Sequence, residues 1–236
     1  MKLNLKKPAI LLSIFSLLLL NFQIALALPA KANVRDIGRI NFIHYAKGTG
    51  QSSNAKAGAC YSLMGVKWKT SSVNYAINPT NSQGLSTSFI TDAISSSAET
   101  WDNATSRELF NNSYSMDTTA VYGVLDDKNS ITFSAYPDNN VIAVTSVWYL
   151  RAGREIVEFD QTYNTHFSWG DATADPTKMD LANIVTHELG HAVGLNDIYK
   201  STCGEVTMYG YGTEGEIKKT SLEIPDIIGL QKMYGI

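Results

Sequence analysis

The sequence is short of positive charge, and this absence excludes one large class of partner. Its 236 residues include 19 lysines and arginines against 22 aspartates and glutamates, which gives a formal net charge of −3. A nucleic-acid-binding domain normally presents a basic surface to the phosphate backbone, so we expect no nucleic-acid partner. Hydrophobic residues make up 44% and charged residues 17% of the chain. That balance is typical of a globular protein with a buried core.

Cysteine is equally scarce, since Cys60 and Cys203 are the only two. A lone pair of cysteines in an oxidising compartment forms a disulfide more often than two free thiols. A bridge between them would close a loop of about 140 residues, worth up to roughly 5 kcal/mol in the chain-entropy view of disulfides. We therefore predict a Cys60–Cys203 disulfide for a chain outside the cytoplasm.

One long apolar run is present, and it lies at the N-terminus. Three lysines precede an apolar stretch over residues 8–28, which is the pattern of a secretory signal. Small-x-small sites for cleavage follow at residues 25–27 and 30–32. The alternative is an uncleaved anchor, because the run approaches the roughly 20 residues that span a bilayer. We predict a signal peptide over residues 1–32 and a secreted, extracellular protein, anchored to the membrane only if the signal stays.

The rest of the chain divides into a short lead-in and one domain. Residues 33–59 are polar and rich in small residues, which indicates a short pro-segment or flexible lead-in. Residues 60–236 show no internal repeat and mix two kinds of pattern. Strand patterns lie at residues 72–77, 121–125, 131–135, 141–150 and 155–161, and helical patterns at residues 86–101, 180–193 and 225–234. This mixture predicts one α/β domain with a twisted sheet.

The second predicted helix carries a pattern typical of a zinc site. His187 and His191 lie four residues apart, so their imidazoles point the same way and can meet one zinc ion. Glu188 stands at the edge of this site, where it can accept a proton from a metal-bound water. Gly194 allows a sharp turn after the helix. Asp197 then arrives where the reversed chain can supply a third ligand.

These residues resemble a known signature. The segment over residues 187–197 resembles the metzincin pattern H-E-x-x-H-x-x-G-x-x-H, with Asp197 in place of the third histidine, as in snapalysin-type secreted bacterial metallopeptidases. The tetrapeptide Thr207-Met208-Tyr209-Gly210 is similar to the Met-turn, in which Met208 would form the apolar floor beneath the metal. Residues 224–235 are similar to the terminal helix of matrixins, where Asp226 matches the residue that braces the Met-turn backbone.

The resemblance covers about residues 67–236 and implies a fold. The implied fold is an α/β (α+β) metzincin-like catalytic domain, and we expect this metallopeptidase domain to occupy residues 60–236. Its sheet is twisted and mostly parallel with an antiparallel edge strand, and an active-site helix, the Met-turn and a C-terminal helix complete it. Substrates of this family lie extended and antiparallel to the edge strand. Residues 155–169 are our candidate for that edge.

The resemblance also implies a function. It predicts a secreted zinc metalloendopeptidase that hydrolyses peptide bonds through a zinc-bound water activated by Glu188, with zinc held by His187, His191 and Asp197. The expected partner is a protein or peptide substrate. We expect a monomer without membrane association once the signal is cleaved. Calcium is a further possible ion at Asp160, Asp171 or Asp175, although acidic residues in turns are usually only solvated.

Several alternatives stay open at this point. The third ligand could be a glutamate, as in thermolysin, and Glu205, Glu214 and Glu216 are available downstream. The cysteine-switch motif of matrixins is missing, although Cys60 could still block the metal as a thiolate. A different class is a non-catalytic secreted zinc-binding or adhesion protein on the same scaffold. The presence of Glu188 weighs against it, because a structural zinc site needs no base.

Overall fold

The structure, a computed structural model, describes residues 36–49 and 60–236. The predicted signal peptide over residues 1–32 lies outside the described residues. Among the helices that are described, none combines the length and hydropathy that crossing a bilayer requires.

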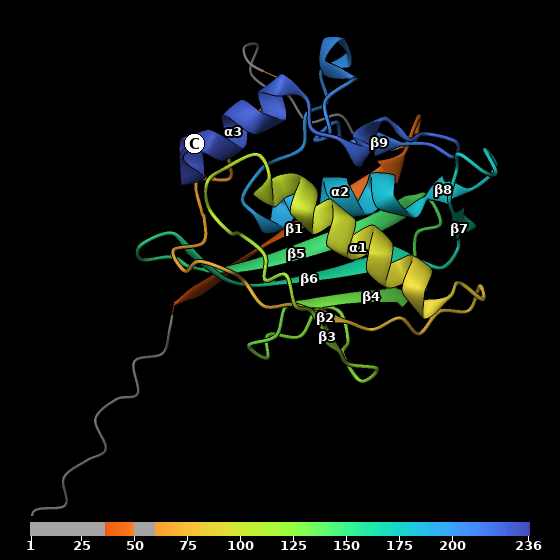
Figure 1. The fold of residues 1–236 in the computed structure, drawn as a ribbon, viewed down its shortest axis with the longest axis horizontal. Helices are drawn as coiled ribbons and strands as arrows, with labels where there is room; N and C mark the ends of the chain where they lie inside the picture. The colour runs from red at the N-terminus through yellow and green to blue at the C-terminus, as the bar shows by residue number, and fades with distance from the viewer. Residues whose placement is uncertain (1–35, 50–59) are drawn as a thin grey trace, which may run out of the picture. The chain divides into compact units, whose positions relative to one another are not determined.

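A seven-stranded sheet runs through the described part of the chain in the order β3-β2-β4-β6-β5-β1-β9 (Figure 1). Strands β2, β3, β4 and β6 are mutually parallel, whereas β5 runs antiparallel to both β6 and β1. A short parallel pair, β7 and β8, lies outside this sheet. The bounds are β1 (Ile37–Ala46), β2 (Ala76–Ile77), β3 (Ser115–Met116), β4 (Ser130–Ser134), β5 (Val141–Leu150), β6 (Glu155–Asn164), β7 (Trp169–Gly170), β8 (Met179–Asp180) and β9 (Tyr211–Gly212).

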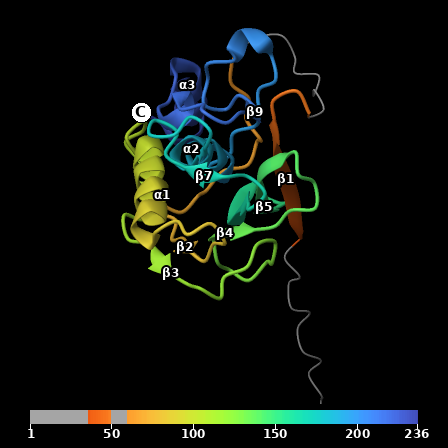
Figure 2. The ribbon, with the colours of Figure 1, turned by 90° about the vertical axis from the view of Figure 1, so that its right-hand side faces the viewer.

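Two helices, α1 (Thr87–Asp102) and α2 (Leu181–Ala192), cover one face of the sheet (Figures 1 and 2). Each begins at a side-chain cap. The Ser86 hydroxyl accepts from the Phe89 N–H, and the Asp180 carboxylate accepts from the Asn183 N–H. Both helices start within a residue or two of the helical patterns predicted at residues 86–101 and 180–193. A third helix, α3 (Ile224–Tyr234), follows two short 3-10 turns at Ser201–Cys203 and Lys218–Thr220.

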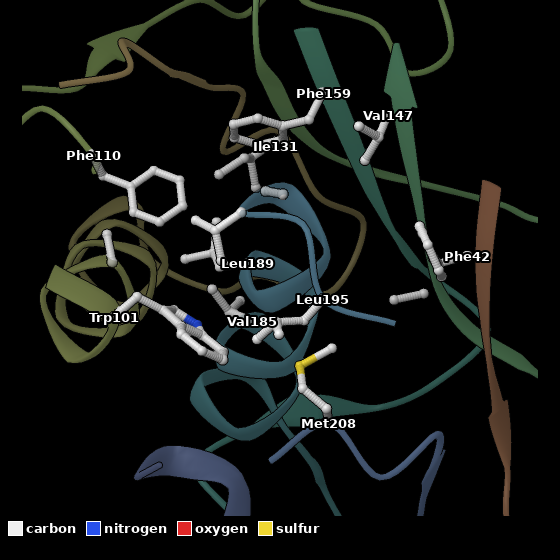
Figure 3. Close-up of a cluster of buried hydrophobic side chains, with 14 of the residues drawn as sticks. Phe42, Trp101, Phe110, Ile131, Val147, Phe159, Val185, Leu189, Leu195 and Met208 are labelled. Carbon is white, nitrogen blue, oxygen red and sulfur yellow. The ribbon is translucent and has the colours of Figure 1, made fainter. Parts of the chain in front are cut away.

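The core lies between the two helices and the sheet. In Figure 3, Trp101 of α1 lies beside Val185 of α2, while Ile131 and Phe159 approach from the strands. The Trp101 side chain is fully buried, and its indole N–H donates to the Thr186 carbonyl at 2.8 Å. Burial of a side chain of this size stabilises a fold by roughly 1.5–3 kcal/mol or more. The contact also holds α2, the helix with the His-Glu-x-x-His pattern, at a defined height above the sheet.

The two cysteines form the predicted disulfide. Cys60 and Cys203 are bonded with a Cα–Cα distance of 5.5 Å across a sequence separation of 143 residues. The bond confirms the predicted pairing and excludes Cys60 as a free thiolate on a metal. It ties the beginning of the domain to the loop that follows α2.

Part of the predicted pro-segment or lead-in over residues 33–59 has regular structure. Residues 37–46 form the ten-residue strand β1. Its sequence alternates, with Ile40, Phe42 and His44 on one face and Arg39 and Asn41 on the other, as a strand requires. The stretch is therefore part of the sheet.

Two predictions about strands were wrong. Residues 121–125 form no strand, because the Gly123 and Val124 N–H groups donate to the Asp160 carboxylate instead of to a neighbouring strand. The proposed edge over residues 155–169 is not an edge, since β6 lies between β4 and β5. The strand that is antiparallel to both of its neighbours is β5. It would be the edge of the sheet if β1 and β9 were absent.

Candidate metal centre

Helix α2 presents both histidines of the motif in a defined ring orientation. The Nδ1 atom of His187 lies 2.7 Å from the Thr207 carbonyl oxygen, and Nδ1 of His191 lies 2.8 Å from that of Leu195. A carbonyl only accepts, so each Nδ1 carries the proton. Each Nε2 is then left with a free lone pair, which is the state in which histidine binds a metal.

A glycine turn brings the chain back to the two histidines. Gly194 has a φ of +107°, a conformation that residues with a Cβ rarely adopt. A Cβ at this position would also lie 2.5 Å from the Val66 carbonyl oxygen. Glycine is therefore required both by the backbone angle and by the close approach of a neighbouring chain. The turn returns Asp197 to the face of the histidines.

Asp197 completes a three-residue group. Its Oδ1 atom lies 3.2 Å from Nε2 of His187 and 3.4 Å from Nε2 of His191. Within the described residues, Oδ1 and the His187 Nε2 are buried without a hydrogen-bond partner. The other carboxylate oxygen accepts from the Tyr199 hydroxyl at 3.0 Å, which turns Oδ1 toward the histidines. Two imidazoles and one carboxylate that converge with unused lone pairs fit a zinc ion.

The electrostatics of the group suit a cation. Burial lowers the pKa of His187 to about 4, so this ring is neutral near pH 7. Burial alone would raise the pKa of Asp197, but the electrostatic attraction of the adjacent His191 and His187 side chains holds it well below its usual value. A carboxylate that stays ionised beside a neutral imidazole is the state that a divalent metal needs.

Glu188 lies beside this group without joining it. The residue is fully buried, and its Oε2 accepts from the Thr145 hydroxyl of β5 at 2.5 Å. Its Oε1 has no hydrogen-bond partner among the described residues. Burial raises the pKa of Glu188 to about 7. One oxygen is thus held by the sheet, and the other is free to exchange a proton near neutral pH.

Met208, the methionine of the expected Met-turn, is packed against helix α2. The residue is 1% exposed, and a Cβ on Gly190 would collide with its sulfur (Figure 3). Gly190 lies between the two histidines on α2, so the methionine packs directly under the centre. Asp226 supports this turn, because its carboxylate accepts from the Thr207 N–H at 2.9 Å, the Met208 N–H at 3.2 Å and the Glu223 N–H at 3.0 Å.

We predict that Asp226→Ala destabilises the protein by about 3 kcal/mol or more. The change leaves three N–H groups of the turn without their charged acceptor, and each hydrogen bond to a charged group contributes roughly 1.5–3 kcal/mol. Urea denaturation measures the loss. Asp92→Ala is the control, since Asp92 is an exposed acid on α1. Equal midpoints for the two variants would contradict the bracing role.

The structure adds a residue that the sequence analysis missed. His44 of β1 is 1% exposed, and its ring centroid lies 4.1 Å from that of His187. Its Nδ1 is 3.4 Å from Oε1 of Glu188. Phe42 stacks on His191 at 3.9 Å between ring centroids. The alternation of β1 was the signal that could have identified this strand, because it places both rings on one face.

The other candidate ligands lie elsewhere. Glu205 pairs with Lys218 and Glu216 with Lys219, and neither these two nor Glu214 belongs to a metal-capable group in the described part of the chain. The carboxylates considered for calcium already accept from N–H and O–H groups of their own surroundings. These are Asp160, which accepts from Gly123, Val124 and Ser130, and Asp171 and Asp175, which accept from Thr173 and Thr177.

Comparison with known families gives one match. The protein-family model for Matrixin (Peptidase_M10) matches residues 67–235. This range contains α1, α2 and α3, the Gly194 turn and Met208, and leaves out β1. No curated protein matches the chain.

Proposed function

Because the chain belongs to the matrixin family of zinc-dependent endopeptidases, we propose that it hydrolyses peptide bonds at the centre on α2. The observation that carries the proposal is the convergence of His187, His191 and Asp197 beside a separately held carboxylate. Three protein ligands with one position left over are the composition of a catalytic zinc site rather than a structural one.

In this proposal His187, His191 and Asp197 hold the zinc. Their two imidazole nitrogens and one carboxylate oxygen are the lone pairs left unused by the hydrogen bonds of the site. When bound, zinc supplies a Lewis acid that makes water more acidic and polarises a carbonyl group. The third ligand is a carboxylate where most metzincins have histidine, so this centre is more anionic than theirs.

Glu188 acts as the general base. Its free Oε1 takes a proton from the attacking water and returns it to the nitrogen of the departing amine. Thr145 holds the other oxygen, so the carboxylate does not turn away from the site. This arrangement argues against a non-catalytic binding protein, because a buried carboxylate oxygen without a partner is costly and a structural site has no use for it.

The substrate is a protein or peptide in extended form. We propose that it pairs with β5, whose backbone passes next to Glu188 through Thr145. An added strand gains main-chain hydrogen bonds along an edge irrespective of its sequence. Secretion belongs to the same proposal and is supported by the N-terminal signal pattern and by the Cys60–Cys203 disulfide.

Removal of the metal tests the proposal. We expect a chelator such as 1,10-phenanthroline to abolish casein hydrolysis by the purified protein, and stoichiometric zinc to restore it. Because β1 lies along the site, the assay is run both on the whole chain and on a chain cut once in the exposed turn after Ala46. Hydrolysis that persists without metal would rule out a zinc peptidase, as would no hydrolysis in any zinc-loaded form.

A further inference from the structure

We propose that β1 is an internal inhibitory strand that occupies the substrate's place on β5, with His44 closing the open side of the metal centre. The inference rests on the proposed function of that centre. It assigns a role to a segment that lies outside the residues matched by the family.

The backbone of β1 takes the position that an extended substrate would need. Its residues pair antiparallel with β5 from Ile37 opposite Leu150 to Tyr45 opposite Val141. The outer edge of β5 is thereby used over its whole length. An incoming peptide cannot pair with this edge until β1 leaves, because the outward N–H and C=O groups of β5 already form their ladder hydrogen bonds with β1.

The side chains of β1 fix it in register over the centre. On its inward face, Phe42 stacks on the metal-binding candidate His191. On its outward face, Arg39 donates to the Ser146 hydroxyl of β5 at 2.7 Å, and that hydroxyl donates to Asn41 at 2.9 Å. A slip by one residue would turn His44 away from the site, so these contacts determine which side chain faces it.

The ring nitrogens of His44 are available to bind a metal ion. Both of its ring nitrogens are buried, and neither has a hydrogen-bond partner within the described residues. A buried imidazole without partners costs free energy unless something else satisfies it. Its ring lies against His187 and its Nδ1 faces Glu188. It therefore stands between the candidate ligands and the candidate base.

β1 runs antiparallel to β5, as the substrate is proposed to do, and would therefore be open to hydrolysis itself. A fourth protein ligand on the zinc explains why β1 is not cleaved. His44 belongs to a second metal-capable group, with His187 and Glu188, beside the group of His187, His191 and Asp197. Ligation by His44 on that side would give an ion on the latter three residues a fourth protein ligand, which is the closed composition of a structural zinc site. No position then remains for water. The free oxygen of Glu188 faces the His44 ring. The peptide bonds of β1 are thus protected by its own histidine.

The chain after β1 is suited to release of the strand. Lys47, Gly48 and Thr49 are exposed directly after β1, whereas Cys60 is fastened to Cys203. A single cut in this exposed turn would free β1, which contains no cysteine. The disulfide would keep the following chain attached to the domain. Inhibition would then end as the freed strand is diluted, because its effective concentration at the site falls once the covalent link is cut.

The test uses the whole chain with Co²⁺ in place of zinc and acetohydroxamate as the probe of an open metal position. Binding is followed by the visible absorption of the cobalt. We expect His44→Ala to bind the hydroxamate at least about 100-fold more tightly than the wild type, because the competent state is rare while His44 ligates. Ile43→Ala, on the opposite face of β1, is the matched control and should behave as the wild type.

A second version of the protein does not depend on the folding of the His44 variant. A recognition sequence for a site-specific protease is inserted between Gly48 and Thr49, and the folded protein is then cut. We expect hydroxamate binding and peptide hydrolysis to appear only after the cut. Addition of a synthetic peptide of residues 36–47 should suppress both again, and the same peptide with alanine at position 44 should suppress them less.

The outcomes separate the two proposals. If wild type, control and His44→Ala bind the hydroxamate equally, and the cut changes nothing, β1 does not close the centre. If the cut opens the centre to hydroxamate but no form hydrolyses peptides, the strand is an occupant of the site as proposed and the peptidase function is overturned.

Discussion

Glu188→Gln should lower kcat/KM for peptide hydrolysis by about 10²–10⁴-fold, the range that general-base catalysis contributes in enzymes. The substitution keeps the size of the side chain and its hydrogen bond to Thr145, whose hydroxyl can still donate to the amide oxygen. It removes the carboxylate that we propose takes the proton of the attacking water. Zinc content should stay stoichiometric, because Glu188 lies outside the group of His187, His191 and Asp197 that we propose holds the ion, although it forms a second group with His44 and His187.

The measurement needs an open centre and a matched control. Hydrolysis of an internally quenched peptide is followed after release of β1 by the engineered cut, and bound zinc is determined by atomic absorption. Glu205→Gln is the control, since Glu205 is an exposed glutamate paired only with Lys218. Full activity in Glu188→Gln would remove Glu188 as the base. Loss of zinc together with activity would show that it acts as a ligand instead.

Asp197→Ala should weaken zinc binding by more than about 100-fold. Loss of a residue that only positions a ligand costs roughly 10–100-fold in metal affinity, and loss of a ligand costs more. The carboxylate also supplies the negative charge of the group, because its pKa is held well below its usual value. Two imidazoles would remain in the open form of the site, which is too few for tight binding of zinc.

A graded comparison distinguishes a ligand from a merely nearby acid. Tyr199→Phe removes the hydrogen bond to the second oxygen of Asp197 and leaves the carboxylate in place. We expect it to weaken zinc binding by roughly 10–100-fold at most, as a positioning residue does. Zinc affinity is measured by competition with a chromophoric chelator. Equal affinity in the wild type and Asp197→Ala would remove Asp197 from the ligand set. One of the downstream glutamates would then be the next candidate for the third ligand.

Helix α2 could be predicted from the sequence because its determinants are local. Apolar periodicity gives its buried stripe and Gly194 ends it, and the structure adds Asp180 as its cap, all within one short stretch of chain. The spacing of His187 and His191 follows from 3.6 residues per turn. The structure adds the tautomers of both rings, which depend on the Thr207 and Leu195 carbonyls and therefore on the folded loop.

The order of the strands in the sheet could not be predicted from local sequence patterns. Residues 141–150 and 155–164 both have strand composition, and neither sequence says which neighbour it meets. The choice of β6 as the edge was wrong because β4, on the parallel side, pairs with it from Ser130 to Ser134. Pairing is decided by the whole sheet at once, through the helices that connect parallel strands and the face each strand must bury.

Local sequence patterns were enough to identify the residues that we propose hold a zinc ion, the proposed base beside them and the methionine turn beneath them. These lie in motifs whose spacing is set by helix geometry and by one glycine turn. That His44 lies against Glu188 depends on the tertiary structure. The two residues are more than 140 positions apart, and they meet because the sheet brings β1 onto β5. No local pattern records that long-range pairing.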